Sequence, residues 1–239
     1  MSSFGSSSGS GPESRFDAVL FDVGDTLLRL TGSGVTLVHR AAEELGAGPL
    51  DPGRVEAAWR RVLARSGTSE ELAKGRDLCA QQHRAVWTRL YTDCGCDALA
   101  PGLSDRLYEL TIRARSWEPF PDALPTLAAL HERGLPLGVV SDTGFDLRPA
   151  LSQAGLLSLF DTVVLSYEQG RCKPAPAVFL AACAELGVAP ARTLMVGDNA
   201  STDGGAAAAG LFVLLLPPAG EGLRGLGHVL SLVAAPVLV

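Results

Sequence analysis

The stretch FDAVLFDVGDT, residues 16–26, contains the first strand and the first polar motif predicted for this chain. Residues 16–21 form a short β-favouring run, and Asp22 opens a glycine-containing turn directly after it. Further apolar runs of strand length lie at residues 137–140, 162–165, 194–196 and 211–216. Segments with helical periodicity lie between them, at residues 123–133, 177–186 and 203–209. Apolar strands that alternate with helices predict an α/β fold, with a parallel sheet covered by helices on both faces.

The strand signal disappears between residues 31 and 116. Amphipathic helical stretches replace it, at residues 38–45, 55–64, 78–91 and 103–113. We therefore expect residues 31–116 to form a helical domain inserted into an α/β core of residues 16–30 and 117–239. The two prolines of WEPFP, residues 117–121, would stiffen the return crossing as a hinge. Residues 1–15 are rich in serine and glycine and predict a flexible tail.

Composition limits the classes of partner. The chain has 239 residues, 47% of them hydrophobic, which predicts a globular protein with a substantial core. Its formal net charge of −6 would repel nucleic acid and anionic membranes, so neither is expected as a partner. The apolar stretch at residues 229–239 is too short to span a bilayer.

The cysteines and the N-terminal residues indicate a compartment. The five cysteines are odd in number and irregularly spaced, without the histidines of a zinc site, so free thiols in a reducing environment are expected. Residues 1–15 lack the apolar run of a secretion signal. A cytoplasmic location is the expectation.

Polar motifs follow the predicted strands in a fixed order. They are DVGDT at residues 22–26, Ser141–Asp142, Lys173–Pro174, and GDN at residues 197–199 with Asp203. Ligands bind at the carboxyl ends of the strands in such sheets, so we expect the four motifs to form one site. Together they closely resemble the haloacid dehalogenase superfamily, over residues 16 to about 216. The resemblance implies a Rossmann-like core with an inserted helical cap of the C1 type, and most members are phosphatases with an aspartate nucleophile.

The resemblance implies a nucleophile and a metal. Asp22 would attack phosphorus and form an aspartyl phosphate, which splits one difficult displacement into two easier ones. Attack by an anion on an anion requires charge neutralisation, which Mg²⁺ would supply. Its protein ligands would be Asp22, the backbone carbonyl of Gly24 and Asp198. Asp203 would act through a water molecule or orient Asp198.

The remaining roles belong to Lys173 and Ser141. Lys173 would neutralise the nucleophile and one phosphoryl oxygen as a compact charge, and Ser141 would donate to another oxygen. The expected substrate is a small phosphorylated metabolite. Each motif also has a simpler explanation alone: Asp22 as a turn residue, Asp198 as part of a helix N-cap, Lys173 as a solvated loop lysine.

Gly24 departs from the family pattern. Phosphatases of this superfamily usually carry a second aspartate there, which protonates the leaving alkoxide and then activates water. Here the acidic residue, Asp25, comes one position later. Loss of an acid–base group typically forfeits about 10²–10⁴ in rate. Three explanations remain open: Asp25 or a cap residue replaces the acid, the substrate has a good leaving group, or the chain has abandoned phosphate-ester hydrolysis.

The third explanation includes two related chemistries. A dehalogenase needs no acid, but it also needs no metal, which would leave Asp198 and Asp203 without a task. Phosphonate-cleaving relatives use a cap lysine to form a Schiff base, and Lys74 is the one lysine in the predicted cap. A non-catalytic binding module that keeps the fold and the metal site is a third alternative. Substrate contacts would come from the predicted cap, where the candidates are Arg60, Arg61, Arg76 and Arg84.

Overall fold

The computed structural model describes residues 15–220 and 222–234. All but residue 15 of the predicted tail therefore lies outside the described residues. A five-stranded sheet forms the centre, in the order β5-β4-β1-β6-β7, and all its pairings are parallel. Its strands are β1 (Ala18–Phe21), β4 (Leu137–Ser141), β5 (Thr162–Leu165), β6 (Thr193–Gly197) and β7 (Phe212–Leu215).

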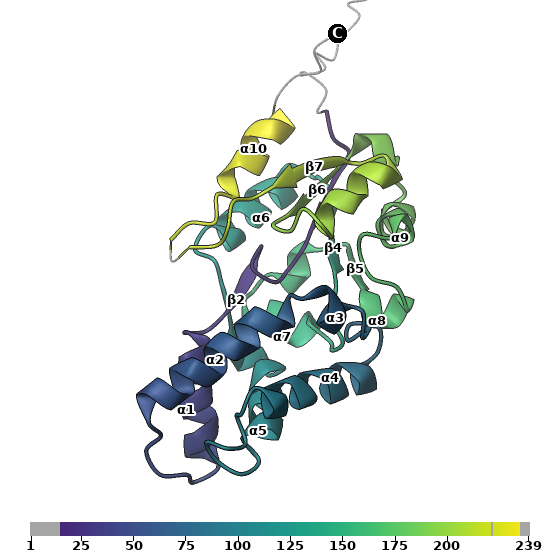
Figure 1. Cartoon of the computed structure of the whole chain (residues 1–239). Helices are drawn as coiled ribbons and strands as arrows, with labels where there is room; N and C mark the ends of the chain where they lie inside the picture. The colour runs from purple at the N-terminus through teal and green to yellow at the C-terminus, as the bar shows by residue number, and fades with distance from the viewer. Residues whose placement is uncertain (1–14, 221, 235–239) are drawn as a thin grey trace, which may run out of the picture.

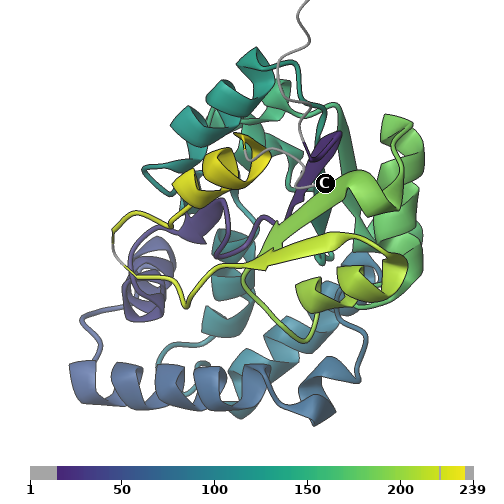
Figure 2. The same cartoon turned by 90° about the horizontal axis from the view of Figure 1, so that it is seen from above.

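Helices cover both faces of this sheet, which confirms the predicted fold class (Figure 2). One face packs against α6 (Ala123–Glu132), α7 (Arg148–Gln153) and α10 (Gly227–Ala234). The other packs against α9 (Pro176–Leu186) and the 3-10 helix η4 (Asp203–Ala209). Short helices lie in the connections, namely α8 (Ser166–Gln169), η1 (Ala114–Ser116), η2 (Leu157–Leu159) and η3 (Pro190–Arg192).

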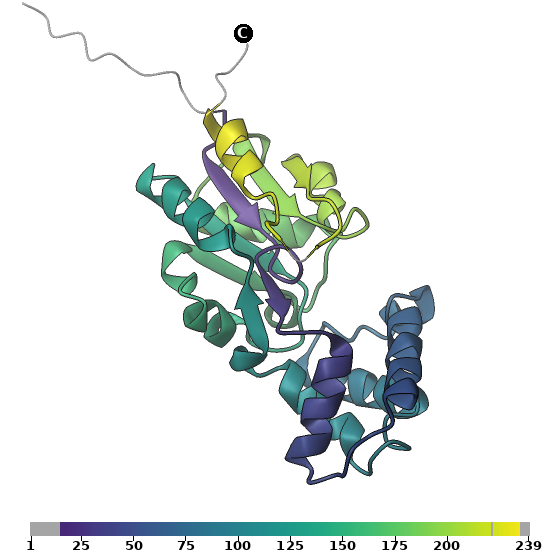
Figure 3. The same cartoon turned by 90° about the vertical axis from the view of Figure 1, so that its left-hand side faces the viewer.

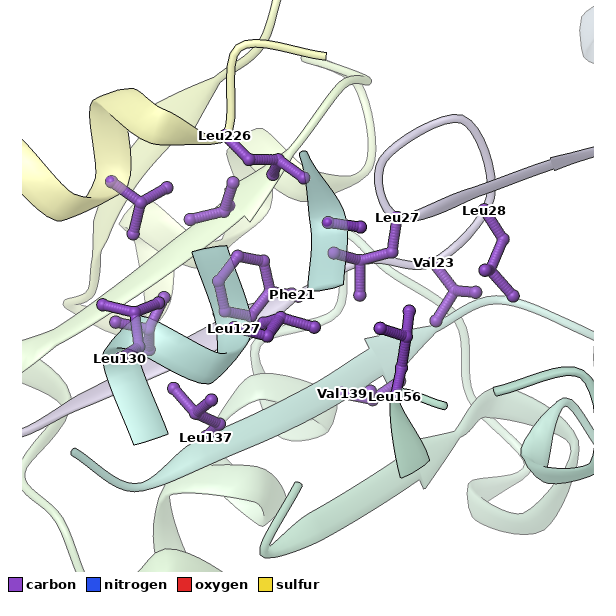
Figure 4. Packing of buried hydrophobic residues seen from close by; sticks show 14 of the residues in the cluster. Phe21, Val23, Leu27, Leu28, Leu127, Leu130, Leu137, Val139, Leu156 and Leu226 are labelled. Atoms are coloured by element: carbon purple, nitrogen blue, oxygen red, sulfur yellow. The ribbon is translucent and has the colours of Figure 1, made fainter. Parts of the chain in front are cut away.

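The core on the α6 face extends into the turn that follows β1. Phe21 packs among leucines of α6, and Val23 and Leu27 continue the same cluster beyond the strand (Figure 4). All three side chains are fully buried. Alternate residues of a strand face opposite sides of the sheet, and the Leu20 side chain joins the cluster on the other face. The turn after β1 is therefore anchored by burial on both sides of Asp22.

Five α-helices, followed by η1, fill the chain between β2 and β3. They are α1 (Gly34–Glu44), α2 (Pro52–Ser66), α3 (Ser69–Leu72), α4 (Ala80–Asp93) and α5 (Leu103–Thr111). We call residues 34–111 the helical insert. It has a hydrophobic cluster of its own and lies beyond one end of the sheet (Figures 1 and 3). The side chains of Ser33 and Asp51 cap α1 and α2 by accepting backbone N–H groups.

A second, two-stranded sheet joins the insert to the core. Strands β2 (Leu28–Leu30) and β3 (Trp117–Pro119) pair antiparallel, and Arg29 Nε donates to Glu118 Oε1 at 2.9 Å. The sequence predicts only a proline hinge at residues 117–121, so β3 was missed. It has three residues and depends on a partner 89 positions away, which no local pattern reveals.

Two further elements differ from the sequence prediction. Residues 203–209 form a 3-10 helix, η4, where their alanine content predicts an ordinary helix. Residues 227–234 form α10, which was not predicted. Among the described residues, no helix is both long enough and apolar enough to cross a membrane. The five cysteines all lie in the described part of the chain and are unpaired.

Candidate active site

Three strand ends bring acidic side chains to one edge of the sheet. Asp22 follows β1, Asp142 follows β4 and Asp198 follows β6. These strands are neighbours in the sheet, with β1 between β4 and β6. The Asp22 backbone N–H donates to the carbonyl of Val196 at 2.9 Å, so β1 stays paired with β6 up to the carboxylate. The position of Asp22 is therefore fixed by the sheet itself.

Asp22, Asp142, Lys173, Asp198 and Asp203 form a buried or half-buried cluster of charges. Lys173 lies at its centre. Its Nζ donates to Asp22 Oδ1 at 2.7 Å and to Asp203 Oδ1 at 2.6 Å. Its backbone N–H donates to Asp142 Oδ1 at 2.9 Å. Lys173 is only 6% exposed, so it is not the solvated loop lysine of the simpler explanation. It is a buried cation that links two carboxylates of the cluster.

The positive charge of Lys173 and the negative charges of the surrounding carboxylates stabilise one another. Burial opposes the positive charge of Lys173, but the carboxylates of Asp22, Asp203 and Asp142 outweigh burial and raise the pKa of Lys173 above its ordinary range. Burial also raises the pKa of Asp22, while the charge of Lys173 opposes this increase. The pKa of Asp198 rises to about 6, first through burial and then through the charges of Asp22 and Asp203. Excess negative charge at this edge favours a bound cation.

Both oxygens of the Asp203 carboxylate accept hydrogen bonds. Its Oδ1 accepts from Lys173, and its Oδ2 accepts the backbone N–H groups of Asp198 and Asn199, each at 3.0 Å. A Cβ placed on Gly197 would lie 2.2 Å from Asp203 Oδ2, so only glycine allows this carboxylate to approach the end of β6. Asp203 therefore fixes the loop that carries Asp198.

Three carboxylates meet closely enough to hold a metal ion. Oxygens of Asp22, Asp198 and Asp203 lie within 4.8 Å of one another. Carboxylate and carbonyl oxygens are the ligands that Mg²⁺ prefers. The donor set therefore fits the predicted ion, with Asp22 and Asp198 freer to bind it than Asp203.

The turn after Asp22 is held from the C-terminal part of the chain. Asp25 has a φ of 53°, a left-handed conformation that is uncommon outside glycine. Arg224 is buried, and its Nε donates to the Asp25 carbonyl at 2.5 Å and its Nη1 to the Pro217 carbonyl at 2.5 Å. Gly24 is partly exposed, and a Cβ built on it would meet nothing within 4 Å. No local sequence signal identifies Arg224, because its partner is 199 positions away.

Ser141 and Asp142 complete the strand-end set. Ser141 is the last residue of β4 and is buried at 4% exposure. Asp142 does not cap the following helix, because its Oδ1 accepts the Lys173 N–H and α7 begins only at Arg148. The pKa of Asp142 rises to about 6, mainly through burial, which Lys173 opposes.

All four candidate arginines have partners within the insert, and Arg76 Nη1 donates to the Ser66 carbonyl at 2.7 Å. Arg60 pairs with Glu56, Arg61 donates to the Cys94 carbonyl, and Arg84 pairs with Asp105. Of these four, only Arg76 lies next to Asp77, at 3.5 Å between Nε and Oδ2. The charge of Lys173 acts to lower the pKa of Asp77.

A family comparison identifies the chain. The family model of the haloacid dehalogenase-like hydrolases matches residues 16–210, which include every residue of the cluster. The chain belongs to this family. It is therefore a hydrolase of the haloacid dehalogenase superfamily, as the motifs predict.

Two relatives and one solved structure illustrate the family likeness. The haloacid dehalogenase-like hydrolase domain-containing protein 3 of Danio rerio is 34% identical over 76% of this chain and 76% of its own length. A phosphoserine phosphatase of Thermus thermophilus is 40% identical over 77% of this chain and 82% of its own. A solved dehalogenase shares the fold with a TM-score of 0.65 at 24% identity, over 92% of this chain and 98% of that one. The fold is thus common to both chemistries.

Proposed function

We propose that this hydrolase is a magnesium-dependent phosphatase that uses Asp22 as its nucleophile. The observation that carries the proposal is the buried Lys173 between Asp22 and Asp203, beside Asp198. A dehalogenase has no use for an acidic metal cluster of this kind. The phosphatase-named relative from Thermus thermophilus supports the same choice. The expected substrate is a small phosphorylated metabolite, and the expected compartment is the cytoplasm.

The residues would divide the work as follows. The Asp22 carboxylate attacks phosphorus, and Lys173 lowers the cost of bringing two anions together. Asp22, the Gly24 carbonyl and Asp198 would hold Mg²⁺, with Asp203 orienting the loop of Asp198. When bound, Mg²⁺ supplies charge neutralisation for the phosphoryl oxygens. Ser141 would donate to another of these oxygens from the end of β4.

The phosphonate alternative loses support from the position of Lys74. Its Nζ pairs with Glu71 Oε1 at 2.8 Å, and its side chain is 37% exposed. A lysine that forms a Schiff base must have its Nζ free to attack a carbonyl group, and the Nζ of Lys74 is held by the Glu71 carboxylate. Lys74 is thus an ordinary ion-paired residue of the insert.

The test is hydrolysis of 4-nitrophenyl phosphate with Mg²⁺, with EDTA, and with Asp22→Asn. We expect turnover that EDTA abolishes and that Asp22→Asn removes. Activity that survives the substitution would refute the nucleophile assignment. Metal-independent turnover would revive the dehalogenase alternative. Metal binding without turnover on a broad phosphate panel would favour a binding module.

A further inference from the structure

The acid–base group missing at Gly24 has a candidate in the helical insert. Asp77 lies between α3 and α4. Its backbone carbonyl accepts a hydrogen bond of 2.6 Å from Ser166 Oγ, and Ser166 directly follows β5. The same Ser166 oxygen accepts the N–H of Thr143, which lies just beyond β4. The insert therefore contacts the core at the edge of the sheet where the cluster lies.

Hydrogen bonds place Asp77 next to neighbours of the cluster, because Thr143 directly follows Asp142, whose Oδ1 accepts the backbone N–H of Lys173. The charge of Lys173 acts on Asp77, and the charge of Asp77 acts on Asp142. Lys173 is the residue that also contacts Asp22. The charge of Lys173 thus acts on Asp77 as well as on the proposed nucleophile, although the two aspartates come from different parts of the chain.

The surroundings of Asp77 suit a carboxyl that exchanges a proton. Burial raises its pKa, opposed by the nearby charges of Arg76 and Lys173. Arg76 Nε lies 3.5 Å from Asp77 Oδ2, and His83 Nε2 lies 3.6 Å from Oδ1. His83 is neutral at neutral pH, because burial lowers its pKa to about 4. Its Nδ1 is hydrogen-bonded to the Tyr108 hydroxyl at 3.0 Å, and its Nε2 faces Asp77.

Packing fixes this group of side chains against the core. A Cβ on Gly144 would lie 2.1 Å from the Cβ of His83, so the insert and the β4 loop touch closely there. The His83 ring centroid is 5.4 Å from that of Phe145 in the same loop. Asp77 is held to the core on one side by Ser166 and adjoins His83 on the other.

We propose that Asp77 is the catalytic acid and base that Gly24 cannot supply. The inference rests on the proposed phosphatase function. In the first step the Asp77 carboxyl gives its proton to the leaving oxygen while the P–O bond breaks and the Asp22–phosphorus bond forms. In the second step the Asp77 carboxylate takes a proton from the water that attacks the aspartyl phosphate. Asp22 and inorganic phosphate are released, and Asp77 is protonated again.

Asp25 is less suited to the same task. The charge of Asp25 acts on Asp198, and Arg224 holds the Asp25 carbonyl. Its carboxyl therefore belongs to the metal side of the cluster. Asp77 adjoins the lysine side, and it reaches the site only when the insert lies against the core.

The test compares Asp77→Asn with the unsubstituted protein on two aryl phosphates. Nitrophenolate leaves without a proton, whereas phenolate from phenyl phosphate leaves poorly. We expect kcat/KM for phenyl phosphate to fall by about 10²–10⁴ in Asp77→Asn, and that for 4-nitrophenyl phosphate to fall far less. Because the second step also needs a base, 4-nitrophenyl phosphate should give a burst near one nitrophenolate per enzyme, followed by slow turnover.

Two further variants separate chemistry from folding. Asp105→Asn is the matched control, because Asp105 is an exposed aspartate of the same insert, and its kinetics should not change. Gly24→Asp has open space for its side chain. In the Asp77→Asn background it should restore phenyl phosphate hydrolysis at least about 10-fold, because it replaces the acid. In the unsubstituted protein it should add little.

The outcomes distinguish this inference from the proposed function. Turnover in Asp22→Asn would refute the phosphatase mechanism. If Asp22→Asn is inactive but Asp77→Asn shows no burst and equal losses on both substrates, only the role of Asp77 is wrong. Equal acceleration by Gly24→Asp in both backgrounds would also overturn it, since the unsubstituted protein would then lack an acid.

Discussion

The buried ammonium of Lys173 shows how strongly single residues depend on one another at this site. It lies within 2.7 Å of Asp22 and 2.6 Å of Asp203, and all three side chains are nearly inaccessible. A buried charge is stable only when it is paired. The same ammonium that supports catalysis in the proposed mechanism therefore also stabilises the fold.

Replacing Lys173 by methionine should destabilise the protein. The substitution leaves Asp22 and Asp203 buried without their cation, which should lower the free energy of unfolding by about 3–5 kcal/mol in EDTA. Urea unfolding measures this. Lys74→Met is the matched control, since the chain has only two lysines and Arg65 would still pair with Glu71. It should cost no more than about 1 kcal/mol. Equal losses in the two variants would contradict the account.

His83 should make stability depend on pH. Its pKa is about 4 in the folded protein, against an ordinary value of 6.5, so between these values the unfolded chain binds more protons. Stability is therefore full above about pH 6.5 and decreases as pH falls towards 4, by up to roughly 3 kcal/mol.

Urea unfolding at neutral and acidic pH checks this, with His83→Gln beside the unsubstituted protein. Asp142 and Asp198 act in the opposite direction, but both proteins contain them. The difference between the two pH dependences thus reports on His83 together with Asp77, which lies 3.6 Å from its Nε2. Parallel pH dependences would show that His83 is not buried as a neutral ring.

At the scale of elements, the proposed mechanism depends on the contact between insert and core. The β2–β3 pair connects the two parts on one side, and the Asp77–Ser166 hydrogen bond connects them on the other. His83 on α4 lies directly against Gly144 in the loop after β4. Closure of such a lid excludes water and assembles the reacting groups.

Gly144→Ala should therefore impair catalysis without unfolding either part. The added Cβ would meet His83 at 2.1 Å and force the insert away from the core. A misplacement of this size should lower kcat/KM for phenyl phosphate by about 10²-fold. Gly48→Ala is the control, because Gly48 is exposed in the insert and a Cβ there meets nothing within 4 Å. Unchanged kinetics in Gly144→Ala, with an unchanged circular dichroism spectrum, would argue against closure.

At the scale of the whole molecule, the sequence predicts the strands of the main sheet better than the contacts between distant parts of the chain. Each strand of the main sheet is an apolar run between turn residues, and such runs are visible locally. Strand β3 and the Arg224 anchor depend on partners far away in the chain, so no local pattern reveals them. The strand-end motifs predicted Asp22, Asp198 and Asp203 as one group, which the structure brings within 4.8 Å.

The position of Asp77 was not predicted, for the same physical reason. The insert could be recognised as helical, but only its packing on the core shows which insert residue approaches the strand ends. The contacts of the candidate arginines in the insert could not be predicted either, since neighbouring helices and loops supply their partners. Local patterns specify elements, whereas docking between parts specifies the lid residues of a site.

Mapping the covalent intermediate identifies the residue that attacks phosphorus. The protein, with Mg²⁺ and 4-nitrophenyl phosphate, is quenched in acid during turnover and treated with borohydride, which reduces an aspartyl phosphate to homoserine. Peptide mass spectrometry then locates the reduced residue. The account predicts homoserine at position 22, in larger yield in Asp77→Asn and absent without substrate. Turnover with an unmodified Asp22, or reduction at another aspartate, would contradict it.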